Sequence, residues 1–292
     1  MLIKVRKMSR ILFFLAPCII YVFIVRILPA FVSFYYSLSS WNILNSEKPL
    51  SLIGFQNYIN IFQDTGFYNS LKITLIITVV ATIIELVLGL ILALIVDQKM
   101  RFKSAIRATL LIPMFITPVV VGTIWYILFH DTIGPINFLL SLIGVGHINW
   151  FSNTTTALVT IIVSDIWQWT PFIFILLLAA LQSIDPNLYE AAEVDGASNL
   201  KKFRFITLPM LTSTMIIGAI MRSMDAFREF DKVFVMTGGG PGKSTEVLSF
   251  YIYKQAFTFY EMGYASALVI VSLAILSVIY TVFNRYLADT NS

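Results

Sequence analysis

Long apolar runs limit what this chain can fold into more than any other feature of its sequence. A helix that crosses the hydrocarbon core of a bilayer needs about 20 consecutive, mostly apolar residues. Runs of that kind lie at about 11–38, 71–96, 106–130, 156–182, 206–227 and 264–287. Because lipid offers the backbone no hydrogen bonds, each run is expected to form a helix. The sequence therefore predicts an all-α membrane protein with about six transmembrane helices, organised as a single domain over residues 1–292.

The composition supports this prediction. The chain is 58% hydrophobic and 12% charged, with a mean hydropathy of +0.84, which is far more apolar than a soluble domain of its size. A cleaved signal peptide is an alternative for the N-terminus, but the first apolar run contains Arg26 and does not end in a small-residue cleavage site. We interpret this run as an uncleaved first span. The one cysteine, Cys18, excludes a disulfide within the chain.

Basic residues predict the orientation of such a chain, because cytoplasmic connections are enriched in Lys and Arg. Three basic groups precede the first span or fill the second and fourth connections: Lys4, Arg6, Lys7 and Arg10; Lys99, Arg101, Lys103 and Arg107; Lys201, Lys202 and Arg204. Both termini are therefore predicted to be cytoplasmic. The fifth connection is also basic, which by itself argues against the outside position that this topology gives it. The even number of spans and the basic N-terminus outweigh that argument. The net charge of +4 follows mostly from this bias and does not indicate a nucleic acid partner.

The fourth connection, about 183–205, is the most densely patterned polar stretch. Asp185 can cap a helix that begins at Pro186, where the missing N–H costs nothing. Gly196 suits a left-handed residue that ends this helix, and Ser198 can cap the next one. The pattern predicts a cytoplasmic helix-turn-helix with a small apolar side, which a soluble partner could hold in a groove.

The stretch from Glu190 to Pro209, which overlaps this connection, resembles a known family. Seven of its residues reproduce, at the family's spacing, the EAA-loop pattern of permease subunits of binding-protein-dependent ABC importers: Glu190, Ala191, Ala192, Gly196, Ile206, Leu208 and Pro209. The resemblance continues through Trp167–Pro171 and through Phe230 and Asp231 to Thr237–Pro241, so it covers almost the whole chain. The chain looks most like the sugar-importing branch.

The resemblance implies a type I ABC importer permease fold, in a prokaryotic inner or plasma membrane, that forms half of the translocation path for a carbohydrate or polyol. The implied partners are a second, similar permease subunit in a heterodimer, a cytoplasmic dimer of ATPase subunits and an extracytoplasmic solute-binding protein. The ATPase would bind ATP and Mg²⁺, so neither a catalytic site nor a cofactor is expected in this chain. The residues implied in ATPase coupling are Glu190, Ala191, Ala192, Asp195, Gly196, Ile206, Leu208 and Pro209.

Polar side chains inside the spans are candidates for the solute path, because such groups are costly in lipid unless they pair or serve a function. Aromatic rings can cover the apolar face of a sugar, while Gln, Asp and Thr can bond its hydroxyls. The candidates are Glu85, Asp165, Trp167, Gln168, Trp169, Thr170, Arg222 and Asp225. Packing within the bundle is the alternative for each, and Arg222 and Asp225, three residues apart, can also neutralise each other. Pro171 is predicted to break the fourth span near mid-membrane.

A glycine-rich segment is expected in the last external connection. Its candidate residues are Phe230, Asp231, Thr237, Gly238, Gly239, Gly240 and Pro241. Residues Thr237–Ser244 end like a Walker A phosphate loop, but that pattern requires glycine at the position of Thr237, and Pro241 removes an N–H from the cradle. The segment instead resembles the TGGGP signature of sugar permeases. Gly239 is expected in a turn at positive φ.

Other classes of protein fit less well. A secondary transporter would need ion-coupling residues, for which Glu85 and Asp165 could serve, but the loop around Glu190 would then be unexplained. A membrane receptor or scaffold predicts no solute flux. No metal site is predicted, because neither His130 nor His147 has a carboxylate or a second His at ligand spacing. Close approaches between helices are predicted at Gly89, Gly122 and Gly218.

Overall fold

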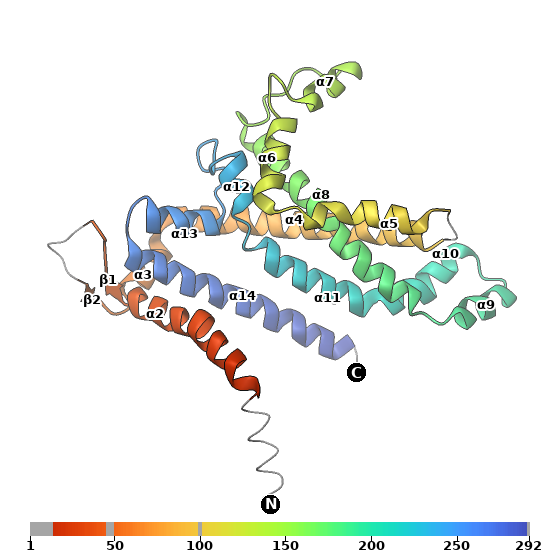
Figure 1. Cartoon of the computed structure of the whole chain (residues 1–292), viewed down its shortest axis with the longest axis horizontal. Coiled ribbons are helices and arrows are strands. Elements are labelled where there is room, and N and C mark those ends of the chain that lie inside the picture. Colours follow the sequence, from red (N-terminus) through yellow and green to blue (C-terminus); the bar gives the residue numbers. More distant parts are fainter. Residues whose placement is uncertain (1–13, 45–49, 99–100, 291–292) are drawn as a thin grey trace, which may run out of the picture. The chain divides into compact units, whose positions relative to one another are not determined.

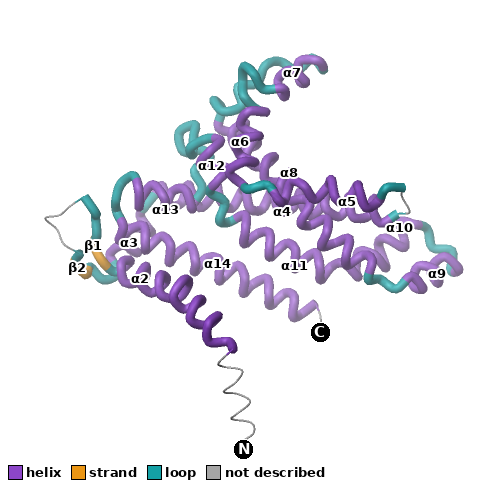
Figure 2. Tube along the Cα trace, viewed as in Figure 1, coloured by secondary structure: helices purple, strands orange, loops and turns teal. Residues whose placement is uncertain are grey.

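The computed structural model describes residues 14–44, 50–98 and 101–290. Helices make up most of the structure, as Figure 1 shows by element and Figure 2 by type, and a pair of two-residue strands accompanies them. Contacts divide the chain into two compact units. One comprises 1–64 with 252–275, and the other 65–251 with 276–292.

The first unit contains η1 (Phe23–Ile27), α2 (Leu28–Ser37), β1 (Ser39–Ser40), β2 (Ser51–Leu52) and α3 (Gln56–Gln63). The two strands are antiparallel, with Ser39 opposite Leu52. The buried Asn57 side chain donates hydrogen bonds to the carbonyls of Ser37 and Ser39, at 2.8 and 3.0 Å, and so fixes the chain where it leaves α2. Gly263 lies against the same segment, because a Cβ there would collide with the Ser39 carbonyl oxygen.

The second unit contains α4 (Thr65–Asp97), α5 (Lys103–Leu111), η2 (Ile112–Phe115), α6 (Pro118–Leu128), α7 (Pro135–Leu142), α8 (Thr154–Gln182), α9 (Pro186–Val194), α10 (Asn199–Lys202), η3 (Phe203–Thr207), α11 (Leu208–Ala226) and α12 (Asp231–Met236). Two further helices, α13 (Leu248–Phe257) and α14 (Met262–Thr290), each run from one unit into the other. Five described helices are long and apolar enough to cross a membrane: Phe14–Ser37, Thr65–Asp97, Thr154–Gln182, Asn199–Ala226 and Met262–Val282. A bent pair of helices brings the number to six, in agreement with the prediction.

The bent pair corrects the prediction of one continuous span at 106–130. Residues Lys103–Phe115 meet Pro118–Leu128 at an angle of 97°. Ile116 and Thr117, between them, have extended backbones with ψ of 135° and 142°. A proline disfavours the helical conformation in the residue before it, so Pro118 accounts for the break. The apolar composition continues through the bend, which is why composition alone predicted one span.

The prediction that Pro171 breaks the fourth span is also wrong. α8 is helical from Thr154 to Gln182, with Pro171 inside it and buried. Proline removes one backbone hydrogen bond, but packing against neighbouring helices lets membrane helices tolerate it. α4 supplies this support, since it packs along α8 (Figure 1).

Glycines allow the central helices of the second unit to approach closely, as predicted. A Cβ on Gly89 of α4 would lie 2.6 Å from Ile173 Cγ2 of α8, and a Cβ on Gly218 of α11 would lie 3.0 Å from Leu176 Cδ2. A side chain on Gly89 would force α4 and α8 apart, and one on Gly218 would require the Leu176 and Ile173 side chains to shift. The core between α4 and α8 is formed by Ala93, Val96, Ile173, Phe174, Leu177 and Leu178.

Candidate functional site

Three helices bring ionisable side chains together in the middle of the second unit. Arg222 of α11 donates from Nε to Glu85 Oε2 of α4 at 2.7 Å. Its Nη2 bonds Asp165 of α8, and its Nη1 reaches Asp225 Oδ2 at 3.2 Å. The predicted pairing of Arg222 with Asp225 is therefore present. The stronger partners of Arg222 are buried, however, and lie on other helices.

A second cation, which the sequence analysis did not identify, completes this group. Lys232 of α12 is fully buried, and its Nζ lies 2.9 Å from Asp165 Oδ1 and 2.7 Å from Glu229 Oε2. Lys232 belongs to the basic fifth connection, which the sequence predicts to lie outside. The available signal was the spacing of Glu229 and Lys232, three residues apart between apolar neighbours. We call Glu85, Asp165, Arg222, Glu229 and Lys232 the buried charge cluster.

Gln168 lies beside this cluster. Its Oε1 accepts a hydrogen bond from Lys232 Nζ at 3.0 Å, and its Nε2 donates to the Ile116 carbonyl at 2.8 Å. The Ile116 carbonyl is available because the backbone is extended at the bend between η2 and α6. The ring of Trp169 faces the Arg222 guanidinium, with 5.3 Å from Cζ to the ring centroid. These contacts extend the cluster by an amide and an indole.

The other two α8 candidates do not join the cluster. Trp167 and Thr170 line a separate, largely apolar hollow of about 480 Å³, together with Trp125 of α6. The rings of Trp125 and Trp167 meet edge to face, with centroids 5.8 Å apart. Residues three apart share a helix face, so Asp165 and Gln168 lie on one face of α8 and Trp167 and Thr170 on another. The structure therefore divides the predicted solute-path residues into two sets.

The cluster contains more carboxylates than cations. Two cations, Arg222 and Lys232, face three buried carboxylates, and within the described ranges Glu85 Oε1 accepts no hydrogen bond. Removing one partner of a buried ion pair typically costs 3–5 kcal/mol, because it leaves the other charge without compensation. Each charged side chain of the cluster therefore depends on its partners for charge compensation. A carbohydrate hydroxyl could bond its carboxylate and amide oxygens.

The predicted helix-turn-helix at 183–205 is present. Asp185 accepts a hydrogen bond from the Asn187 N–H at 2.9 Å and caps α9. Gly196 has φ of +73°, and Ser198 Oγ caps α10 by accepting from the Lys201 N–H at 3.4 Å. Each of these local predictions is confirmed. Tyr189 Oη lies 2.9 Å from Thr207 Oγ1, which ties the loop to the start of α11.

Most of this loop is exposed. Glu190, Ala191 and Asp195 are exposed, and Ala192 is half-buried. Further on, Ile206 and Leu208 are half-buried and Pro209 is exposed. Apolar side chains project from the same loop, with exposures of 89% at Val194, 74% at Leu200 and 69% at Phe205.

An ion pair joins the two helices of the loop. Lys202 Nζ lies 2.7 Å from Glu193 Oε1, and this hydrogen bond and the lysine charge lower the pKa of the Glu193 carboxyl below its usual value. Glu193 is exposed and Lys202 is half-buried, so solvent screens the pair and it orients the loop more than it stabilises the fold.

The glycine-rich segment forms a turn after α12. Gly238 and Gly239 have φ of +57° and +82°, so the predicted positive φ at Gly239 is confirmed. Thr245 is buried and closes the turn, because its Oγ1 lies 2.8 Å from Thr237 Oγ1 and 2.8 Å from the Gly240 carbonyl oxygen. Phe230, which precedes α12, stacks on Phe234 with ring centroids 5.5 Å apart, and Asp231 is the first residue of α12.

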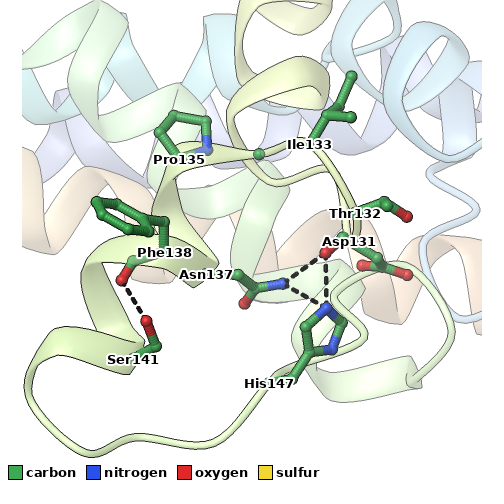
Figure 3. Close-up of a pocket in the computed structure, with 9 residues that line it drawn as sticks. Asp131, Thr132, Ile133, Pro135, Asn137, Phe138, Ser141 and His147 are labelled. Atoms are coloured by element: carbon green, nitrogen blue, oxygen red, sulfur yellow. Dashed lines mark hydrogen bonds between the residues drawn. The ribbon is translucent and has the colours of Figure 1, made fainter.

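The connection between α6 and α8 contains another hollow, of about 690 Å³, shown in Figure 3. Asn137 Nδ2 donates to the carbonyls of Asp131 and Ile148, at 3.2 and 3.0 Å, and His147 Nε2 lies 2.6 Å from the Asp131 carbonyl oxygen. These polar groups bond one another and so hold the turn closed. Among the residues that the structure describes, no group of three or more His, Cys, Asp or Glu could hold a metal ion.

The comparisons with known proteins agree with this geometry. Residues 85–290 match the family described as binding-protein-dependent transport system inner membrane component. A probable ABC transporter permease protein of Sinorhizobium fredii is 36% identical over 262 residues, which cover 90% of this chain and 84% of that protein. The trehalose/maltose transport system permease protein MalF of Thermococcus litoralis is 33% identical over 247 residues, covering 85% and 82%.

A solved structure resembles the whole chain. In a bacterial ABC transporter involved in the import of the acidic polysaccharide alginate, one chain superposes with a TM-score of 0.84 at 25% identity, covering 99% of this chain and 98% of that one. The fold is therefore the type I ABC importer permease fold. The chain belongs to the family of binding-protein-dependent inner-membrane transport components and is a permease subunit. Both the family and the fold class predicted from the sequence are confirmed.

Proposed function

We propose that this permease subunit forms half of an inward translocation path for a carbohydrate or polyol. The relatives support the solute class, since similar proteins are named for trehalose and maltose transport and for alginate import. The observation that carries this choice is the pair of buried side chains Asp165 and Gln168, whose oxygens can accept hydrogen bonds from sugar hydroxyls.

The proposed path passes the buried charge cluster. Asp165 and Gln168 offer oxygens to solute hydroxyls, and Trp169 offers an aromatic face to the apolar side of a sugar ring. The position of Asp225 supports access of solute to the cluster, because the Asp225 side chain is 57% exposed while its partner Arg222 is buried. Glu85 compensates the Arg222 charge at Nε.

The proposed assembly has four kinds of component: this chain, a second and similar permease subunit, a cytoplasmic ATPase dimer and an extracytoplasmic solute-binding protein. ATP and Mg²⁺ bind to the ATPase, and this chain contributes no catalytic group or cofactor. The exposed loop 183–205 supports docking to the ATPase, because Glu190, Asp195 and the small residues between them are accessible. With that loop in the cytoplasm, both termini are cytoplasmic and the glycine-rich segment lies outside.

Reconstitution tests this proposal. The permease pair is placed in liposomes with the ATPase on the inside and the solute-binding protein on the outside, and uptake of a labelled neutral sugar is measured. Uptake should require internal ATP, the ATPase and the binding protein together. A proton or sodium gradient alone should drive none. Uptake that follows an ion gradient without ATP would overturn the proposal.

A further inference from the structure

Lys232 is the feature of this structure that most needs an explanation. Lysine side chains are almost never fully buried, because the ammonium group normally stays in water. Here its Nζ forms ion pairs with Asp165 Oδ1 at 2.9 Å and with Glu229 Oε2 at 2.7 Å, and it donates a hydrogen bond to Gln168 Oε1 at 3.0 Å. Two of these acceptors are side chains of the proposed solute path.

The helix that carries Lys232 packs against α6 and α8 (Figure 1). A Cβ on Gly122 of α6 would lie 3.4 Å from Lys232 Cα, so the two backbones nearly touch. On the α8 side, Ser164 Oγ lies 3.6 Å from Met236 Sδ. α12 continues directly into the glycine-rich turn at Thr237. It thus connects the proposed external segment to the buried charge cluster.

We propose that Lys232 occupies the hydrogen-bonding atoms of Asp165 and Gln168 in a closed conformation, and that α12 must move away from α6 and α8 before solute can use those atoms. The inference rests on the proposed function and adds to it a conformational role for one residue. Lys232 is a positioning residue: it holds α12 over the path.

Separation of α12 would leave every buried charge with an opposite charge beside it. Glu229 and Lys232 lie on the same short segment, three residues apart, and can move as a pair. Asp165 keeps its ion pair with Arg222, which also keeps Glu85. The cluster therefore divides into two groups that each contain both signs of charge. This division avoids most of the cost of stranding an ion in a medium of low dielectric.

A disulfide across the contact provides the decisive test. A Cβ on Gly122 would lie 3.5 Å from Val235 Cβ, within the range of about 3.5–4.5 Å that a disulfide requires. The variant pair Gly122→Cys and Val235→Cys is built in a Cys18→Ser background, which removes the native cysteine. The complete importer is reconstituted, oxidised, and assayed for uptake before and after reduction.

Oxidation should reduce uptake at least about tenfold, a change that corresponds to about 1.4 kcal/mol, and reduction should restore it. Each single-cysteine variant, oxidised in the same way, should transport like the reduced pair. Uptake that persists after complete disulfide formation would overturn the inference, and so would failure of the disulfide to form in the resting complex. If the parent importer takes up no solute, the proposed function itself fails.

The Lys232→Met variant supplies a second readout. Loss of the amine should weaken the closed conformation and raise ATP hydrolysis by the assembled complex without solute, by roughly tenfold for about 1.4 kcal/mol of lost bias. Lys232→Arg keeps the charge and should stay closer to the parent. The matched control is Lys243→Met, which changes an exposed lysine of the same external segment. A purely structural role would instead lower assembly and leave hydrolysis per complex unchanged, and that result would contradict the inference.

Discussion

Replacing Arg222 with methionine tests whether the buried charge cluster is a mutually dependent unit. Arg222 is 1% exposed and is the cation that contacts Glu85, at 2.7 Å. Asp165 would keep its ion pair with Lys232 in the variant, but Glu85 would be left buried with no cation against it. Breaking a buried pair in this way costs about 3–5 kcal/mol. At about 2–4 °C per kcal/mol for a chain of this size, the melting temperature should fall by roughly 6–20 °C.

The assay is thermal unfolding of the purified complex in detergent, with two comparisons. Arg228→Met removes an exposed arginine just beyond the same helix and should shift the melting temperature little. Adding Glu85→Gln to Arg222→Met removes the stranded charge and should recover at least about half of the loss. Equal melting temperatures for Arg222→Met and Arg228→Met would refute the reasoning, and so would a double variant no more stable than the single one.

Three further changes follow from the same structure. Gln168→Ala should lower uptake about tenfold or more, while the permease pair still assembles, because it removes the amide of the proposed path that accepts a hydrogen bond from Lys232; wild-type uptake would contradict this role. Gly239→Val should weaken the stimulation of ATP hydrolysis by the solute-loaded binding protein, because φ of +82° is strained for valine and a Cβ at this position would lie 2.9 Å from Phe250 Cε1. Unchanged stimulation would contradict a role of the glycine-rich turn in this response. The pKa of Glu193 is lowered by its ion pair with Lys202, so the pair orders the loop fully at any pH above the usual Glu pKa of about 4.3. This order is lost as the pH falls through the lowered pKa. Hydrogen exchange across 193–202 should therefore become faster in acid.

Local signals were the part of the structure that the sequence predicted best. The caps at Asp185 and Ser198 and the left-handed Gly196 depend on residues within a few positions of one another. Their geometry therefore follows from short-range chemistry. The close approaches at Gly89 and Gly218 were predictable because a missing side chain matters wherever a helix must pack tightly.

The bend before α6 and the continuity of α8 were not predicted, although each of the two spans contains a proline, Pro118 in one and Pro171 in the other. A proline in a span either breaks the helix or is accommodated, and the neighbouring helices decide which. Lys232 was missed for a related reason. Its closest partner on another helix, Asp165, lies far away in the sequence, so that burial of the lysine depends on a contact that no local pattern contains.

The most direct test of the whole account is co-purification with the loop variant Glu190→Ala and Gly196→Asp. Loss of a charge-assisted hydrogen bond at Glu190 costs about 1.5–3 kcal/mol, and a side chain at the left-handed Gly196 costs roughly 1 kcal/mol more. Docking of the ATPase should weaken by about 3 kcal/mol, which is more than a hundredfold in affinity. We predict that the variant keeps the second permease subunit, loses the ATPase and supports no ATP-driven uptake. An ATPase that stays bound, with solute still accumulating, would contradict the claim that loop 183–205 couples this permease to its energy source.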